Sequence, residues 1–348
     1  MDIFSYPIKG KINFREHYEI KRNLSYKILH KLLYEMRFML FYFNCSRFRD
    51  FTNCLTFQLG KLKKIIKFKN YDFIIVEDLF FLPEVIKYNE SAKVIFDARE
   101  YYPSQNEESL FWRLFQKPMR IDICRRFLKK CDHIFTVSDG LMNEYKRQFN
   151  INVSVLLSTP YKCKIKPIYN NNSPIRMVYH GLANKNRELQ NLIKVVNALG
   201  SRFTLDLFLV GRQKEIKDIK KVIINNRVKI LRPVEFSAII PTLNRYDLGF
   251  SFFKPTTFNL LNCLPNKFFE YIQARVPVII GPSPCMMSIV LQHNIGIISK
   301  DYTINSMINA LSNITFSKIS TLKKNIDCIT EKFCFENEVK KLHKIILE

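Results

Sequence analysis

Glycine is scarce in this sequence, and paired cysteines are missing from it. Only 9 of the 348 residues are glycine, while isoleucine, lysine, asparagine and phenylalanine are frequent, a composition typical of an AT-biased coding sequence. The 9 cysteines are odd in number and include no C-x-x-C pair. These cysteines indicate thiols in a reducing compartment, which excludes a disulfide framework and a zinc site.

The sequence also lacks the segments that would send it to or through a membrane. Residues 1–14 contain no apolar stretch of the kind found in secretory signals. Residues 276–299 carry no Asp, Glu, Lys or Arg, but three prolines and two glycines interrupt them, so they predict a strand, loop and helix in a buried core. We therefore expect a cytoplasmic protein.

Positive charge and apolar residues are abundant. The chain has 55 Lys and Arg against 31 Asp and Glu, a formal net charge of +24. With 47% hydrophobic and 14% aromatic residues, it can bury a large core, which excludes a disordered chain, and its length favours two domains. The charge indicates an anionic partner: nucleic acid, lipid headgroups or phosphorylated small molecules. Part of the lysine excess reflects coding bias.

Short apolar runs alternate with helical patterns, which is typical of parallel strands in βαβ units. The predicted strands of the first half are 71–78, 93–98, 133–138 and 153–159. Those of the second half are 175–181, 204–211, 228–234, 248–254, 276–281 and 296–299. The second half therefore predicts one complete doubly wound α/β domain.

A charged, Asn-rich stretch at 162–174 predicts the linker between two domains. We expect an N-terminal domain over 1–165, a doubly wound domain over 166–330 and an amphipathic helix over 331–348. The first 70 residues are basic amphipathic helical patterns, and the strand and glycine turn that normally open such a domain are missing. The N-terminal domain is thus predicted to be shortened or built differently at its start.

The most informative motif is LPNKFFEYIQARVP at 264–277. Pro265 suits the first turn of a helix, where Lys267 and the free N–H groups can bind a phosphate. Glu270, one turn further on the same face, can accept hydrogen bonds from the two vicinal hydroxyls of a ribose. A solvated Lys–Glu pair on a helix face is the structural alternative.

Four segments, in order, resemble the retaining glycosyltransferases of family 4, which use nucleotide-sugar donors. They are VIFDAREYYP at 94–103, CDHIFTVSDGLMNEY at 131–145, IRMVYHGLANKNREL at 175–189 and LPNKFFEYIQARVPVI at 264–279. The resemblance, which runs from about residue 71 to the C-terminus, implies two Rossmann-like domains facing a cleft, the GT-B fold.

The resemblance also implies donor-binding residues. Gly181, Arg187 and Lys267 match the positions that hold the donor diphosphate, and Glu270 matches the ribose carboxylate. Asn262 stands where many members have a glutamate that touches the transferred sugar, so that contact becomes an amide at best. His180 and Asn266 are further candidates for the donor sugar, although His180 at a strand end is as readily a structural histidine.

In the N-terminal half, the family's Asp-Ala-His-Glu reads Asp97, Ala98, Arg99 and Glu100. We assign Asp97, Arg99 and Glu100 to the catalytic, acceptor-side group. Arginine stays protonated and cannot act as a base, so Arg99 suits a phosphate instead. Asp97 at a strand end could equally cap the following turn.

The implied reaction transfers a sugar, with retention, from a nucleoside diphosphate to a glycan or a polyprenyl-diphosphate-linked acceptor in bacterial surface polysaccharide synthesis. Fixed cations would stabilise the departing phosphate. The sequence contains no Asp-x-Asp, the metal-clamping pair of the other large transferase fold, so we expect no metal and no cofactor.

The basic amphipathic stretch at 20–43 predicts contact with an anionic membrane, on the inner face of the plasma membrane, or an ordinary core-facing helix. Three other functions stay open: a non-catalytic pseudo-glycosyltransferase or partner subunit, a nucleotide-sugar epimerase, and a nucleic-acid-binding protein. The last is disfavoured because no recognised DNA- or RNA-binding module is present.

Overall fold

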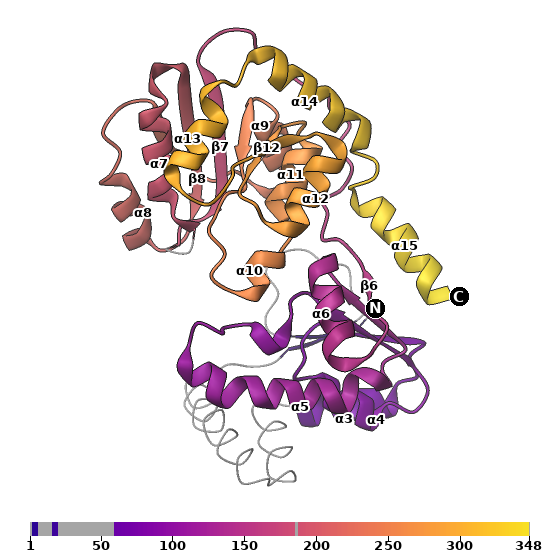
Figure 1. The fold of residues 1–348 in the computed structure, drawn as a ribbon. Helices are drawn as coiled ribbons and strands as arrows, with labels where there is room; N and C mark the ends of the chain where they lie inside the picture. Colours follow the sequence, from indigo (N-terminus) through magenta and orange to yellow (C-terminus); the bar gives the residue numbers. More distant parts are fainter. Residues whose placement is uncertain (1, 6–15, 20–58, 185–186, 348) are drawn as a thin grey trace. The chain divides into compact units, whose positions relative to one another are not determined.

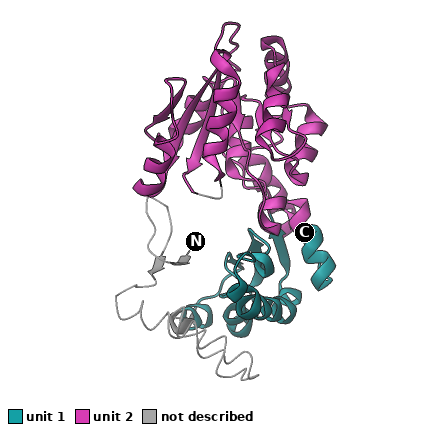
Figure 2. Ribbon diagram, turned by 60° about the vertical axis from the view of Figure 1, so that its left-hand side comes forward, with its two compact units in different colours: residues 1–136, 142–154 teal, residues 137–141, 155–348 magenta. Residues whose placement is uncertain are grey.

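The computed structural model describes residues 2–5, 16–19, 59–184 and 187–347. The chain forms two compact units, one of Met1–Thr136 and Met142–Ser154, and one of Val137–Leu141 and Val155–Glu348 (Figure 1, Figure 2). The segment 20–43, for which a membrane contact was predicted, lies outside the described residues. Each unit is described by itself below.

A four-stranded parallel sheet forms the centre of unit 1. Its order is β3-β4-β5-β6, with strands Phe73–Val76, Lys93–Ala98, His133–Thr136 and Ser154–Val155. Ile95 pairs with His133, and Ala98 with Thr136, so β4 and β5 run in the same direction. All four apolar runs predicted in this half form strands, because their central Ile, Val and Phe residues are suited to a sheet covered by helices.

Helices cover the sheet of unit 1 and pack on one another in chain order, α3 on α4 and α4 on α5 (Figure 1). Their bounds are α3 Leu59–Phe68, α4 Leu82–Tyr88, η1 Tyr102–Ser104, the π-helix η2 Trp112–Gln116, α5 Lys117–Phe127, η3 Leu128–Lys130 and α6 Asp139–Phe149. Of these, α3 falls within the basic helical pattern predicted for the first 70 residues.

The start of the chain contains two short strands that the sequence analysis did not predict. They are β1 Asp2–Ser5 and β2 Glu16–Glu19, which pair in parallel as a two-stranded sheet of their own. Neither joins the four-stranded sheet, which begins at β3. Among the described residues, the predicted opening of this unit stays a prediction, because most of the first 58 residues lie outside them.

Unit 2 contains a six-stranded parallel sheet of order β12-β11-β10-β7-β8-β9. Its strands are β7 Ile175–Leu182, β8 Phe203–Val210, β9 Val228–Leu231, β10 Leu248–Phe250, β11 Val278–Ile280 and β12 Gly296–Ile298. Read from β9, this is the 3-2-1-4-5-6 order of a dinucleotide-binding fold, whose direction of winding reverses beside its first strand. The predicted doubly wound α/β domain is confirmed.

Two apolar cores lie on the two faces of this sheet, because successive residues of a strand point to opposite faces. Met177 and Tyr179 of β7 belong to the core that includes α7 and α13, whereas Val178 belongs to the core that includes α11 and α12. The helices and 3-10 turns are α7 Leu189–Ala198, η5 Gly200–Arg202, α8 Gln213–Lys220, η6 Phe236–Ala238, α9 Ile239–Leu243, α10 Phe258–Asn262, α11 Asn266–Gln273, α12 Pro284–His293, α13 Ile304–Ser312, α14 Phe316–Ile329 and α15 Phe335–Leu347.

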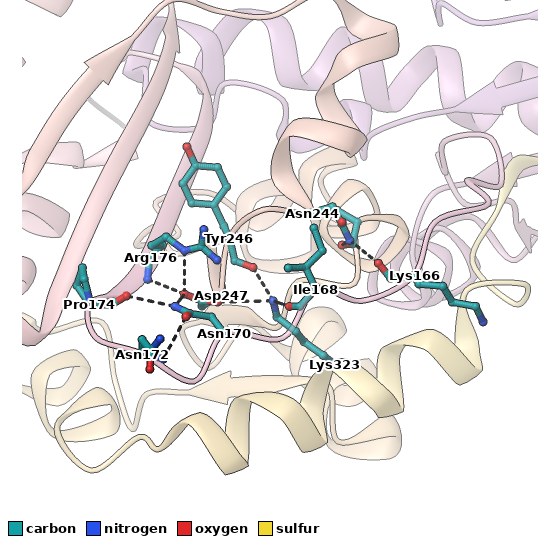
Figure 3. A network of polar contacts seen from close by, with 11 residues as sticks. Lys166, Ile168, Asn170, Asn172, Pro174, Arg176, Asn244, Tyr246, Asp247 and Lys323 are labelled. Carbon is teal, nitrogen blue, oxygen red and sulfur yellow. Dashed lines mark hydrogen bonds and ion pairs between the residues drawn. The ribbon is translucent and has the colours of Figure 1, made fainter.

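The stretch predicted as a linker is held along its backbone by side chains of unit 2 (Figure 3). Asn244 Nδ2 donates to Lys166 O at 3.1 Å, and Lys323 Nζ donates to Ile168 O at 2.6 Å. Further on, Asn170 Nδ2 donates to Asp247 Oδ2 at 3.2 Å. The segment before β7 is therefore part of the folded unit.

Two buried charges, Asp247 and Lys323, lie at the centre of this contact. Asp247 Oδ2 accepts from the Arg176 backbone N at 2.8 Å, and Lys323 Nζ donates to Tyr246 O at 2.8 Å and lies 3.7 Å from Asp247 Oδ1. Burial lowers the pKa of Lys323 to about 8, and the Asp247 charge opposes that shift. A buried ion pair of this kind is costly to break on one side.

No helix in the part of the chain that the structure describes is long and apolar enough to cross a membrane.

Candidate functional site

The candidate site begins at the carboxyl end of β7, beside the point where the sheet reverses its winding, which is where ligands of such sheets bind. Gly181 there has φ +128°, a conformation that side chains disfavour. A Cβ added to Gly181 would lie 3.1 Å from Lys267 Nζ. The glycine therefore permits both the turn and the close approach of the lysine.

Lys267 is brought to this glycine by the first turn of α11. Its side chain is buried, and its Nζ lies 3.8 Å from the centre of the Tyr179 ring. Burial, and then the nearby charge of Arg187, lower the pKa of Lys267 to about 7, although Glu270 acts in the opposite direction. A buried ammonium beside a second cation is what a site for an anion requires.

Glu270 and His180 face each other next to Lys267. His180 Nε2 lies 3.2 Å from Glu270 Oε2, but the two make no hydrogen bond of good geometry. Burial and then the Lys267 charge lower the pKa of His180 to about 3, so the imidazole is neutral. Burial raises the pKa of Glu270, and Lys267 opposes this. Because His180 makes no hydrogen bond to it, the Glu270 carboxyl group has oxygen atoms that can accept hydrogen bonds from hydroxyl groups.

Arg187 completes the cationic part of the site. Its guanidinium carbon lies 4.5 Å from the centre of the Phe253 ring. Its charge helps to lower the pKa of Lys267 and opposes the rise in the pKa of Tyr179 that burial causes. Its Nη1 and the Asn184 Oδ1 are buried and have no hydrogen-bond partner among the described residues. Buried polar atoms without partners are rare and here indicate a ligand that supplies them.

The sequence analysis missed the contact that fixes α11 against the sheet. Tyr271 Oη donates to Val178 O and Phe250 O, both at 3.3 Å, and so touches β7 and β10 together. A Cβ at Gly249 would lie 2.5 Å from the Tyr271 ring, so only glycine leaves room for it. The tyrosine of the PNKFFEY motif is thus a positioning residue for Lys267 and Glu270.

The two asparagines predicted to touch the donor sugar are placed differently from each other. Asn266 is the exposed first residue of α11. Asn262 is buried at the end of α10, where its Nδ2 donates to Phe258 O at 3.0 Å. The Asn262 amide is therefore partly used within its own helix.

An apolar cavity of about 130 Å³ opens beside the glycine turn. His180 and Gly181 form one of its walls, and the rest of the lining comes from β8, α9 and the segment after β9: Phe208, Val210, Pro233, Val234, Ile239, Thr242 and Leu243. The sequence analysis did not identify this cavity, because its walls come from segments that are far apart along the chain. Its mostly apolar lining suits contact with the flat face of a heterocyclic ring.

The acceptor-side candidates lie in unit 1, at the end of β4. Arg99 Nη2 pairs with Glu77 Oε1 at 2.6 Å and Arg99 Nε with Asp97 Oδ2 at 3.1 Å. Glu100 Oε1 accepts from Gln105 Nε2 at 2.5 Å, and burial raises the pKa of Glu100, against the effects of that bond and of Arg120. Asp97 thus binds the side chain of Arg99, and Glu100 is half-buried in a separate network.

Among the described residues, no group of three His, Cys, Asp or Glu side chains is arranged to hold a metal ion.

A scan against models of protein families found no match, and a search of curated proteins found none either. Solved structures do match. Over 85% of this chain, TarM of S. aureus, solved with UDP, gives a TM-score of 0.65 at 12% identity. Sucrose-phosphate synthase of Thermosynechococcus elongatus gives a TM-score of 0.66 at 12% identity, over 85% of this chain and 77% of the synthase chain. Anabaena HepE, solved with UDP and glucose, gives a TM-score of 0.65 at 13% identity, over 82% of this chain and 80% of the HepE chain.

These structural neighbours are glycosyltransferases of the GT-B fold. This chain has the same fold: two Rossmann-like α/β units built on parallel sheets. It spans about three-fifths of the TarM chain, 59% of its length. At these identities the likeness concerns the fold, so the activity must be argued from the site.

Proposed function

We propose that this protein is a retaining glycosyltransferase of the family 4 type. It takes a sugar from a nucleoside diphosphate and transfers it to a hydroxyl of a glycan or lipid-linked acceptor. One observation carries the proposal: a buried cation, Lys267, and a half-buried one, Arg187, lie beside a glycine turn at the reversal point of a Rossmann-like sheet, with a buried Arg187 N–H left without a partner among the described residues.

The residues of unit 2 match the parts of such a donor. Lys267, Arg187 and the turn at Gly181 would hold the diphosphate, and Glu270 would accept hydrogen bonds from the ribose hydroxyls. The cavity beside His180 suits the base, since its walls are apolar. His180, Asn262 and Asn266 are the candidates for contact with the transferred sugar. Structural neighbours solved with UDP, and one with UDP and glucose, support a nucleotide-sugar donor.

The chemistry follows from where charge develops. When the bond between the anomeric carbon and the donor phosphate oxygen breaks, negative charge grows on the leaving diphosphate, and fixed buried cations stabilise that charge more than they would in water. Lys267 and Arg187 would do this without a metal ion. The acceptor oxygen then bonds to the anomeric carbon on the face from which the diphosphate leaves, and its proton passes to the departing phosphate, which retains the configuration.

On the acceptor side, Arg99 is held by two carboxylates and stays charged, which suits a phosphate of a polyprenyl-diphosphate-linked acceptor. Asp97 and Glu100 would orient the incoming hydroxyl. Surface polysaccharide synthesis on the cytoplasmic side of the plasma membrane is the setting that such an acceptor implies.

The proposal is tested by measuring nucleotide binding to two site variants and one control variant. Lys267→Met and Glu270→Gln should each weaken binding of UDP, GDP or ADP at least tenfold by calorimetry, because each loses a charge-assisted hydrogen bond. Lys300→Met, a substitution outside the site in unit 2, serves as the matched control and should bind normally. If both site variants bind every nucleotide as the unmodified protein does, the donor site is wrong.

A panel of nucleotide sugars then separates transfer from its alternatives. Transfer to a model acceptor, with the anomeric configuration read by NMR, should show retention. A new sugar epimer formed without acceptor would show an epimerase. Tight nucleotide binding with no turnover would favour the pseudo-glycosyltransferase, a reading that Asn262 supports because its amide is partly engaged within α10.

A further inference from the structure

Lys267 differs from the other buried cations of unit 2 in what holds it. Arg275 Nε lies 3.0 Å from Asp327 Oδ1, and Lys323 Nζ lies 3.7 Å from Asp247 Oδ1, so each of these cations has a carboxylate partner. Lys267 is also buried, but it forms no ion pair and donates no hydrogen bond to any of the described residues. A buried charge without a carboxylate partner is costly and needs another source of stabilisation.

The face of an aromatic ring lies where that carboxylate would be. Lys267 Nζ is 3.8 Å from the centre of the Tyr179 ring, and Tyr179 is itself buried. The negative face of a ring attracts a cation, and the attraction is stronger where water is excluded. Unlike a carboxylate, the ring has no net charge and engages no N–H group in a strong hydrogen bond. The ammonium is therefore stabilised while its charge stays available to an anion.

Lys267 reaches this ring across the edge of the sheet. Its helix, α11, covers one face, where the neighbouring Phe268 lies in the core, whereas Tyr179 belongs to the core on the other face. Gly181 leaves the passage open, because a Cβ there would lie 3.1 Å from Lys267 Nζ. The Tyr179 hydroxyl also donates to Leu182 O at 3.1 Å. One tyrosine side chain thus contacts both the lysine and the glycine turn.

Arg187 is held in the same way by a second ring. Its guanidinium carbon lies 4.5 Å from the centre of the ring of Phe253, which is buried. Among the described residues, Arg187 has no carboxylate partner, and its buried Nη1 has no hydrogen-bond partner. Phe253 follows β10, and Tyr179 lies on β7, the two strands that pair at the reversal point of the sheet. The two rings therefore place two unneutralised cations where a ligand of such a sheet binds.

We propose that Tyr179 and Phe253 are positioning residues of the diphosphate site, whose rings hold Lys267 and Arg187 in place without neutralising them. This inference rests on the proposed function, since it takes the ligand to be a nucleoside diphosphate. Cations held by carboxylates would have to give up those ion pairs before they could bind an anion. Cations held by ring faces can keep these contacts while their N–H groups bind phosphate oxygens, so the empty site is already arranged for the ligand.

Calorimetry with UDP, GDP and ADP tests the first ring. Tyr179→Leu removes the ring and should weaken binding of the preferred nucleotide about tenfold, which corresponds to about 1.4 kcal/mol. Tyr179→Phe keeps the ring face and should bind within about threefold of the unmodified protein. Phe203→Leu, which removes another buried ring of the same core at the amino end of β8, is the matched control and should bind normally. Circular dichroism checks that each variant is folded.

Proton uptake gives a readout that a purely structural role would not change. The pKa of Lys267 is about 7, so binding at pH 7 should draw about half a proton onto this lysine. A ring face favours the charged form, so Tyr179→Leu should lower that pKa and increase the uptake, whereas Tyr179→Phe should leave it unchanged. The variants keep the other titratable or charged groups that act on Lys267 or respond to it: Arg187, Glu270, Cys263 and His180.

The second ring is tested by Phe253→Leu. It should weaken nucleotide binding about fivefold, because Arg187 loses the contact that places its guanidinium. It should not increase proton uptake, since an arginine stays protonated in this pH range. Calorimetry at pH 7 in two buffers of different ionisation enthalpy measures both quantities, and the protons of the nucleotide itself contribute equally to every variant.

Two outcomes would overturn the assignment of the rings. One is that Tyr179→Leu binds nucleotide and takes up protons as Tyr179→Phe does. The other is that Phe203→Leu loses as much affinity as Tyr179→Leu, since the loss would then follow from a weakened core. If Lys267→Met also binds every nucleotide normally, the donor site itself is wrong. Failure of the rings and failure of the proposed function therefore give different results.

Discussion

At the residue scale, the unusual member of the site is Lys267, because its ammonium is buried and lies beside another cation. The groups around it are Arg187, Glu270, His180 and Tyr179. Burial, and then the charge of Lys267, lower the pKa of His180 to about 3. Burial raises the pKa of Tyr179 to about 12, although the charge of Arg187 opposes this rise. With a pKa of about 7, Lys267 is a group of this site whose charge changes near neutral pH.

Nucleotide affinity should therefore depend on pH in one direction. The pKa of Lys267 in the free protein is about 7. Below that pH the lysine is already charged, whereas above it a bound diphosphate must draw in a proton, so affinity should fall by up to tenfold per pH unit between pH 7 and 9. Calorimetry at pH 8 in two buffers of different ionisation enthalpy measures the proton uptake.

The control for this pH dependence is Lys267→Arg, whose guanidinium stays charged over the whole range. It should bind nucleotide with little pH dependence and without proton uptake, even if its affinity is lower. Equal affinity of the unmodified protein at pH 7 and pH 9 would contradict the assignment of this lysine to the diphosphate.

At the scale of elements, α14 is joined to β10 and to the segment before β7 by one buried ion pair. Lys323 of α14 and Asp247 just before β10 are each about 1% exposed. Arg176 Nε lies 3.4 Å from the same carboxylate. Their hydrogen bonds to Ile168 O, Tyr246 O and the Arg176 backbone leave few polar atoms of the group without partners.

We expect Asp247→Asn to destabilise the protein by about 3 kcal/mol, because it leaves the Lys323 charge buried without its counter-charge. Urea unfolding followed by circular dichroism measures this loss. The double variant Asp247→Asn/Lys323→Met should lose less stability than the sum of the two single losses, by about 1 kcal/mol or more.

Asp218→Asn, which removes an exposed partner of Lys221, is the surface control and should change stability by less than about 0.5 kcal/mol. Additive losses for Asp247→Asn and Lys323→Met would show that the two buried charges act independently.

At the scale of the whole molecule, each unit has its own sheet, and the single tryptophan belongs to unit 1. Trp112 is 2% exposed there, so its fluorescence reports the unfolding of that unit. The proposed donor site lies in unit 2. Fluorescence and circular dichroism can therefore follow different parts of the chain.

A nucleoside diphosphate should stabilise unit 2 by about 2.7 kcal/mol at a hundredfold excess over its dissociation constant. We expect it to shift the transition seen by circular dichroism and to leave the Trp112 transition nearly unchanged. In Lys267→Met neither transition should move. Equal shifts of both signals in the unmodified protein would show that the two units unfold as one.

Much of this architecture could be predicted from sequence. Runs such as VIIGP and TLDLFLVG are apolar enough to indicate a buried strand, and the glycine or proline that closes each run indicates where the strand ends. The motif at 264–277 indicated Lys267 and Glu270, and the family resemblance indicated Gly181; the fold brings these three residues together. The cavity beside His180 and the Asp247–Lys323 pair could not be predicted, since their members lie far apart along the chain. The π-helical turn was also missed, because its pattern does not differ locally from that of an α-helix.

Strand β7 joins two of the features described above. Asp247 accepts a hydrogen bond from the backbone N of Arg176, near the amino end of β7, and Gly181, the glycine proposed to hold the diphosphate, lies near its carboxyl end. β7 pairs with β10 on one side and β8 on the other, and a paired strand rises about 3.3 Å per residue and cannot stretch. The length of β7 is therefore fixed. The hydrogen bonds that hold the segment before β7 thus determine where Gly181 lies relative to Lys267.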